Sequence, residues 1–144
     1  MLRAIPLIMA AGLLIGCASQ GRETAGLSIK DEMKTVVEPA SNLLFAVQGE
    51  VDPANGPGPP APAARWTAAA DAAGKLKGIA VSMTDPARAK DTGQWVSLSQ
   101  EMGEAADKAL KAARAHDGAG FSDAVNAMSD NCAACHGKYK AQTG

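Results

Sequence analysis

Aromatic residues are scarce in this chain, which has two Phe, two Trp and one Tyr among its 144 residues. Basic charge is not in excess either, because 14 Lys and Arg stand against 15 Asp and Glu. A chain without a basic field lacks the electrostatic footprint of nucleic-acid binding, so we expect no nucleic-acid partner. The longest hydrophobic run, residues 4–15, is also too short to cross a bilayer as a helix.

Alanine is abundant in place of the missing bulky residues. It is the best helix former among the amino acids, so its abundance favours helical structure. Its side chain fills little volume, however, and a helical core built mainly from alanine would contain voids. We therefore expect a bulky cofactor to occupy part of the core.

The first residues have the pattern of a secretory signal. Arg3 provides a positive start, the apolar run of residues 4–15 follows, and the segment ends Leu-Ile-Gly before Cys17. This ending resembles the bacterial lipoprotein box, in which the cysteine is lipidated and becomes the new N-terminus. We expect residues 1–16 to be a signal peptide and residues 17–27 a lipidated tether; the alternative is an ordinary signal peptide that leaves Cys17 as a free thiol.

The lipoprotein interpretation predicts a periplasmic domain that is held at a membrane by lipid. Ala18, rather than aspartate, follows the cysteine, and by analogy with well-studied bacteria this favours the outer membrane. Removal of Arg3 with the signal leaves 13 basic and 15 acidic side chains, so the mature chain is weakly acidic.

Residues 28–144 are predicted to form an all-α domain, an antiparallel four-helix bundle. Apolar residues recur there at steps of three and four in four separate segments, and no β-type alternation is present. Ser28 is the predicted N-cap of the first helix, Pro39 should kink it or mark a local break, and the proline-rich residues 51–62 should form an irregular connection. The predicted inward faces, in chain order, are Ile29, Met33, Val36, Ala40, Leu43 or Leu44, and Val47; Trp66, Ala69, Ala73, Leu76, Ala80 and Met83; Trp95, Leu98, Met102, Ala105, Ala109 and Ala113; and Phe121, Val125, Met128, Cys132, Cys135 and Tyr139.

The sequence Cys132-Ala-Ala-Cys135-His136 is the attachment motif of a c-type haem. Two thiols at this spacing can form thioethers with the two vinyl groups on one porphyrin edge, and the adjacent imidazole can bind the iron. Both cysteines continue the apolar face of the fourth helix, so the motif lies in register with the core. We expect one covalent haem c inside the bundle at one end, where alanine-rich faces leave room.

Other interpretations of the motif fit less well. A zinc site needs about four ligands, and His116, the one other histidine, falls at the opposite end of the bundle. A thioredoxin-type pair would follow a strand, and none is predicted. No second histidine, arginine or nucleophile is placed for catalysis beside the expected haem, so we expect a protein that is not an enzyme.

A haem motif in the last helix of a four-helix bundle, followed by Tyr139 and Lys140, resembles the class II cytochromes c, the group that includes cytochrome c′. The resemblance covers residues 28–140. It implies a bundle with the haem at one end, His136 as the proximal ligand and a sixth ligand, where there is one, from the first helix. It also implies a homodimer in some relatives, formed through the first two helices. The first helix departs from the cytochrome c′ pattern because it lacks an aromatic–arginine pair near its start.

Two functions follow from the choice of the sixth ligand. With Met33 opposite His136, the iron is six-coordinate and the protein carries electrons to or from redox partner proteins of the periplasm or membrane. With Met33 as core packing, Val36 or Val37 covers an open iron that binds NO or CO. Met33 and Met83 are the methionines expected near the haem end, since Met102 and Met128 lie further along their helices. Of the two, Met33 is the favoured ligand and Met83 a weaker candidate.

Overall fold

The computed structural model describes residues 26–56 and 58–140, and the regular structure within them is entirely helical. The first helical segment, residues 29–51, is continuous and consists of α1 (Ile29–Glu32), η1 (Met33–Val37) and α2 (Glu38–Val51). It is followed by α3 (Ala63–Met83), α4 (Gln94–Ala115) and α5 (Gly118–Tyr139). The predicted signal peptide and residues 17–25 of the predicted tether, including Cys17 with its predicted lipid, lie outside the described residues.

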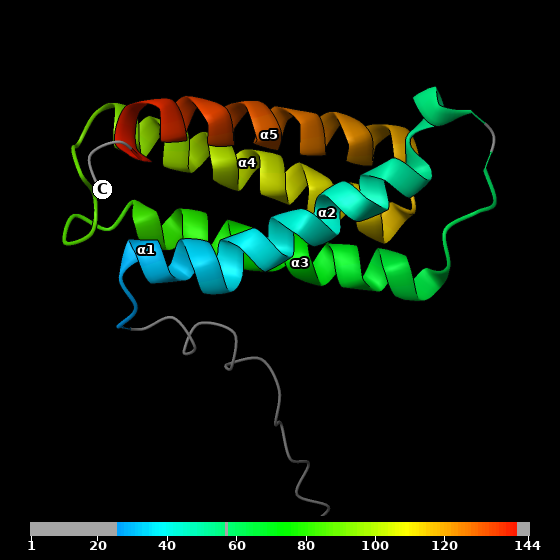
Figure 1. Cartoon of the computed structure of the whole chain (residues 1–144), viewed down its shortest axis with the longest axis horizontal. Helices are drawn as coiled ribbons and strands as arrows, with labels where there is room; N and C mark the ends of the chain where they lie inside the picture. Colours follow the sequence, from blue (N-terminus) through cyan, green and yellow to red (C-terminus); the bar gives the residue numbers. More distant parts are fainter. Residues whose placement is uncertain (1–25, 57, 141–144) are drawn as a thin grey trace, which may run out of the picture.

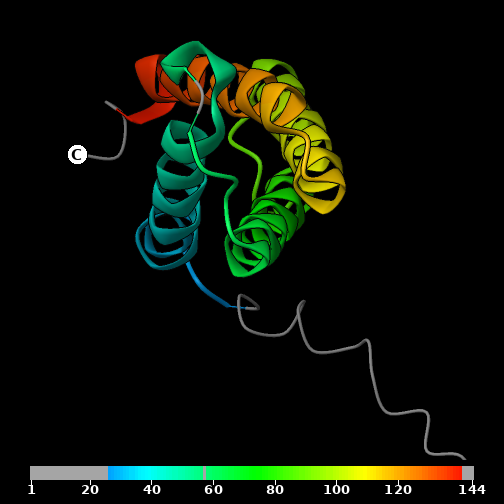
Figure 2. The same cartoon turned by 90° about the vertical axis from the view of Figure 1, so that its right-hand side faces the viewer.

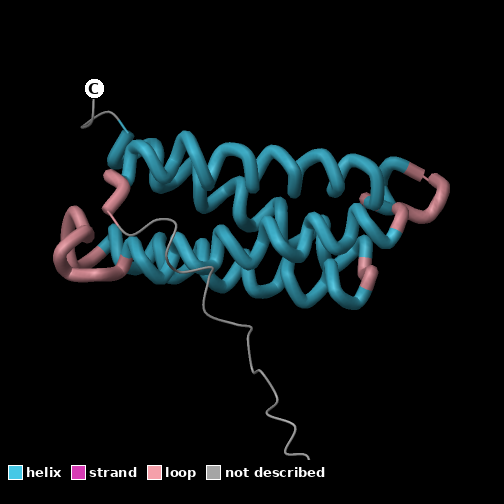
Figure 3. The backbone as a smooth tube through the Cα atoms, turned by 90° about the horizontal axis from the view of Figure 1, so that it is seen from below, coloured by secondary structure: helices cyan, strands magenta, loops and turns pink. Residues whose placement is uncertain are grey.

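These four segments run alternately up and down and are joined at the two ends of a bundle (Figure 1). The loops gather at those ends (Figure 3), and a view along the bundle shows the segments arranged around a common core (Figure 2). The connection after α2 contains one short 3₁₀ turn, η2 (Pro53–Asn55). The predicted all-helical bundle is thus confirmed. Among the described helices, none is long and apolar enough to cross a membrane.

The predicted inward faces of α3, α4 and α5 match the structure closely. Every residue predicted to face inward in α3 and α4 is buried, as are Phe121, Val125, Met128 and Tyr139 in α5. Cys132 and Cys135 are half-buried and pack against the same core. A regular 3.6-residue period therefore describes these three helices from end to end.

The start of the first helix departs from this regularity. Ser28 caps it as predicted, since its Oγ accepts a hydrogen bond from the Asp31 N–H at 3.1 Å. The chain then widens into the π-helical turn η1, where the N–H of Glu38 donates to the carbonyl of Met33. Pro39 explains the widening, because proline has no N–H and its ring clashes with the carbonyl four residues earlier.

The π turn changes which side chains face the core. Glu32 and Val37 are buried, whereas Ile29, Met33 and Val36 are only half-buried against the core. Ile29, Met33 and Val36 therefore pack against the core as predicted, but less deeply than Glu32 and Val37, which the prediction did not place on the inward face. Five residues rather than four separate Glu32 from Val37, as expected across a π turn.

The alanine-rich faces also behave differently from our expectation. They lie mainly between α3 and α4, where small side chains let the two helices approach closely. A Cβ placed on Gly103 of α4 would lie 3.4 Å from the Cβ of Ala80 in α3. Alanine therefore draws the helices together instead of leaving room for a cofactor.

Candidate functional site

An apolar pocket lies at the end of the bundle where the first helix begins and α5 ends. All four segments contribute to it: Met33 and Val37 from η1, Met83 from α3, Leu98, Ser99 and Met102 from α4, and Asn131, Cys132, Cys135 and His136 from α5. The structure thus brings the predicted sixth ligand Met33 into the same pocket as the attachment motif. Met33 lies 99 positions before Cys132 in the sequence, so it is the topology of the bundle that brings the two residues together.

The last turns of α5 present the motif. Cys132 and Cys135 stand one helical turn apart and are half-buried, whereas His136 is exposed beside the pocket. Burial raises the pKa of the Cys132 thiol. It also raises the pKa of Cys135, with a smaller contribution from the neighbouring Cys132. Both sulfurs are therefore held as neutral thiols at neutral pH, while the imidazole remains accessible.

Methionines dominate the rest of the lining. Met33, Met83 and Met102 are three of the four methionines in the described residues, and the fourth, Met128, is buried elsewhere in the core. Met102, which we expected further from the haem end than Met33 and Met83, also lines this pocket. Its place on the predicted inward face of α4 was the available signal. Of the two valines considered as a cover for the iron, Val37 lines the pocket and Val36 does not.

Two polar residues in the lining, Ser99 and Asn131, make hydrogen bonds to the backbone of α4. The Oγ of Ser99 donates to the carbonyl of Trp95 at 2.8 Å. The Nδ2 of Asn131 donates to the carbonyl of Leu98 at 3.1 Å, which ties α5 to α4 immediately before Cys132. Sequence reasoning missed Asn131, because its role depends on a contact between helices.

The lining has the right chemistry for a c-type haem. It combines two cysteine thiols that can form thioether bonds to the porphyrin with an imidazole and methionine sulfurs that can bind the iron. The remaining walls are mainly apolar. The enclosed space is small, about 40 Å³, well below the roughly 300–1,000 Å³ of small-molecule and cofactor sites. A porphyrin is larger than this space, so it fits only when the side chains and segments that line the pocket change position. Methionine side chains have the flexibility for such a change.

Residues 84–93, the loop between α3 and α4, frame the pocket end. The Tyr139 hydroxyl in α5 donates to Oδ2 of Asp91 at 2.5 Å, and its ring meets that of Trp95 edge-on at 4.9 Å. Asp91 also accepts the N–H of Trp95 at 3.0 Å, although the N-cap position of α4 itself belongs to Gly93.

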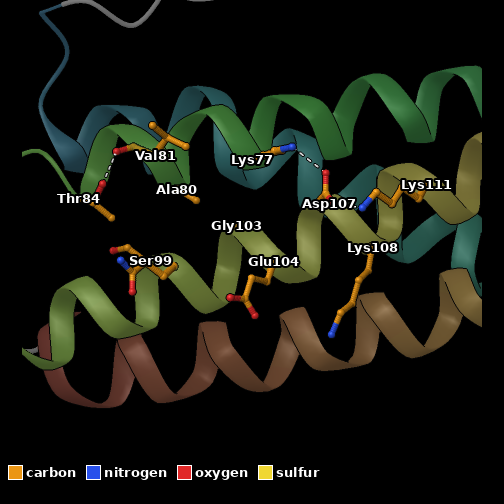
Figure 4. A pocket seen from close by; sticks show the side chains of 11 residues that line it. Lys77, Ala80, Val81, Thr84, Ser99, Gly103, Glu104, Asp107, Lys108 and Lys111 are labelled. Atoms are coloured by element: carbon orange, nitrogen blue, oxygen red, sulfur yellow. Dashed lines mark hydrogen bonds and ion pairs between the residues drawn. The ribbon is translucent and has the colours of Figure 1, made fainter.

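A second, larger hollow of about 800 Å³ lies along α3 and α4 (Figure 4). Its lining is mixed and includes Val81 and several charged side chains. Lys77 and Lys111 each form an ion pair with Asp107, with N–O distances of 2.7 Å. Together they lower the pKa of Asp107 to about 2, and Lys111 makes the largest contribution. None of the predicted haem ligands lines this open groove.

No family model, curated protein or solved structure matches the chain. Within residues 26–56 and 58–140, no three His, Cys, Asp or Glu side chains gather to hold a metal ion. Haem iron needs no such cluster, because the porphyrin supplies four ligands and the protein one or two. The interpretation of the pocket therefore depends on its own residues.

Proposed function

We propose that the protein is a c-type cytochrome that carries electrons through one haem bound at this pocket. The observation that carries the proposal is the meeting of Met33 with Cys132, Cys135 and His136 around one apolar pocket. A haem attached there would have an imidazole on one side and a thioether within reach on the other.

The two cysteines would provide the covalent attachment. Each thiol would add across one vinyl group, with the sulfur bonding to one vinyl carbon and its proton going to the other. Such an addition would need no external oxidant or reductant. His136 follows Cys135 directly and is exposed, so its imidazole is free to turn toward the iron.

Ligation by His136 and Met33 suits electron transfer. A six-coordinate iron keeps its ligands in both oxidation states, so little rearrangement accompanies the transfer, and methionine raises the reduction potential. In this proposal Cys17 carries lipid, the domain faces the periplasm from the outer membrane, and the partners are redox proteins of the periplasm or membrane. The resemblance to class II cytochromes adds a homodimer as a form to be tested.

A gas-binding function is the second candidate, and one observation favours it. Val37 lines the pocket together with Met33, and the Met33 side chain is only half-buried. If Met33 stays off the iron, an apolar side chain would cover an open coordination site, which admits a small neutral ligand such as NO or CO.

Absorption spectra of the matured protein distinguish the two functions. We expect sharp low-spin bands and a weak sulfur-to-iron band in the oxidised wild type. Met33→Ala should convert this spectrum to the broad high-spin form. Met128→Ala is the matched control, because Met128 is buried outside the pocket, and its spectrum should remain low-spin.

A low-spin spectrum that survives Met33→Ala would remove Met33 from the iron, and Met83→Ala and Met102→Ala would then identify the ligand. A wild type that is already high-spin and binds CO rapidly would favour the gas-binding function.

A further inference from the structure

The loop of residues 84–93 contacts the first helix and α5, the two segments that carry the proposed iron ligands (Figure 1). Its own turns are hydrogen-bonded. The Oδ1 of Asp85 accepts the N–H of Ala87 at 2.8 Å, and the carbonyl of Asp85 accepts the N–H of Arg88 at 2.8 Å. Arg88 therefore extends from an ordered backbone.

The first contact joins Arg88 to Glu32, the residue immediately before Met33. The Arg88 guanidinium forms an ion pair with the carboxylate of Glu32, which is completely buried. A second guanidinium nitrogen of Arg88 reaches the carbonyl of Leu27 at 3.5 Å. The start of the first helix is thus attached to the loop on both sides of its N-cap.

Stability alone does not explain this ion pair. Buried pairs are often no more stabilising than apolar side chains of the same size. Here Oε1 of Glu32 and Nε of Arg88 are also buried without a hydrogen-bond partner among the described residues, which adds a desolvation penalty. A buried pair of this kind is better suited to fixing one position of the helix, and hence of Met33.

The second contact joins Asp91 to Tyr139, one helical turn after His136 in α5. The Tyr139 hydrogen bond is the main reason that the pKa of Asp91 is lowered, and the N–H of Trp95 contributes as well. The carboxylate is therefore ionised at neutral pH and holds the end of α5 and the start of α4 together.

We infer that residues 84–93 form a ligand clamp, with Arg88 and Asp91 as positioning residues that set the distance between Met33 and His136. This inference rests on the proposed function. Because a haem must widen the pocket, something has to limit how far the first helix moves from α5. One loop attached to both helices provides that limit, and loosening either contact should weaken the bond between Met33 and iron.

The rate of CO binding to the reduced, matured protein tests the clamp, because CO can bind only after Met33 leaves the iron. Glu32→Gln removes the negative charge from one contact and Tyr139→Phe removes the other hydrogen bond, and we expect each to raise the rate about tenfold, the effect of losing roughly 1.4 kcal/mol of Met33 ligation. Together they should raise it by less than the product of the two effects, because both act through one loop.

Glu50→Gln is the matched control. Glu50 pairs with Arg65 and so links the first helix to α3 at the opposite end of the bundle. Its loss should leave the rate of CO binding unchanged. Arg88→Lys keeps the positive charge and should fall between the wild type and Glu32→Gln, which provides a milder variant if the latter folds poorly.

A second readout does not depend on iron. Amide hydrogen exchange over residues 29–38 of the full chain without haem should be faster in Glu32→Gln than in Glu50→Gln.

The outcomes separate the two proposals. If Met33→Ala itself leaves the CO rate unchanged, Met33 is not the ligand, and the clamp fails together with the proposed ligation by Met33, whereas the proposed haem attachment is not affected. If Met33→Ala raises the rate but Glu32→Gln and Tyr139→Phe do not, even where they lower the stability of the fold, the clamp alone is wrong.

Discussion

The two ends of the bundle are closed in different ways. At the end away from the pocket, the rings of Trp66 and Phe121 meet edge-on, with their centroids 5.7 Å apart. The His116 ring stacks on the Trp66 ring at a centroid distance of 5.4 Å. Phe121 is completely buried there. At the pocket end, three methionines and two thiols share the lining with Val37, Leu98, Ser99, Asn131 and His136, and among the described residues no aromatic ring other than the imidazole lines the pocket.

This difference shows where the molecule can adapt. Aromatic rings have few rotamers, so the Trp66–Phe121 pair fills the far end rigidly, whereas methionines can turn to admit a bulky group. Each end has one pair of aromatic rings, but Trp95 and Tyr139 do not line the pocket, so the space for the proposed cofactor falls among the methionines.

The largest effect on stability is expected when an aromatic ring is removed from the end away from the pocket. Phe121→Ala should lower the free energy of unfolding by about 3–5 kcal/mol, because it leaves a cavity among side chains that cannot collapse. At the pocket end, Met102→Leu conserves volume and should cost less than about 1.5 kcal/mol. Urea unfolding of both variants measures the difference. Equal losses would show that the two ends are equally rigid.

A close backbone contact at the far end should have a smaller effect. A Cβ on Gly118, the first residue of α5, would lie 2.6 Å from the carbonyl oxygen of Val51 at the end of α2. Gly118→Ala should therefore cost about 1–3 kcal/mol through forced backbone movement. Gly78→Ala in α3 meets nothing and should stabilise by about 0.5–1 kcal/mol. Thermal unfolding that shows both variants equally stable would contradict the contact.

The smallest effect concerns the charged contacts between α3 and α4, midway between the ends. Lys111 and Lys77 lower the pKa of Asp107 from 3.8 to about 2. A lowered pKa means that the ionised carboxylate stabilises the fold above pH 3.8, and that this contribution is lost as the pH falls toward 2. Asp107→Asn should thus be less stable than the wild type at pH 6 and equally stable near pH 2. A difference in stability between Asp107→Asn and the wild type that persists at pH 2 would show that the ionised carboxylate is not its cause.

The sequence was sufficient to predict most of the fold, because three helices have a regular apolar period. It was insufficient at the start of the first helix, where Pro39 was expected to disturb the helix but the π turn and the inward position of Glu32 were not foreseen. The sequence also did not show how the alanine-rich faces pack. Two helices with small side chains can approach each other closely, and the spacing of alanines in the sequence does not reveal this.

The candidate site was predictable where it depends on neighbours in the sequence. Cys132, Cys135 and His136 form one motif, and the up-and-down topology brings Met33 to it. The remaining features need contacts between distant segments. The ion pair between Glu32 and Arg88 arises from helix packing and from one ordered loop, for which the sequence carries no local signal.

The most direct test of the account is the intact mass of the mature protein from a host that can assemble c-type cytochromes. We predict a mass larger than that of the polypeptide by one haem, retained under denaturing conditions and lost in the double variant Cys132→Ala, Cys135→Ala. A wild-type protein from that host with no haem adduct would contradict the central claim.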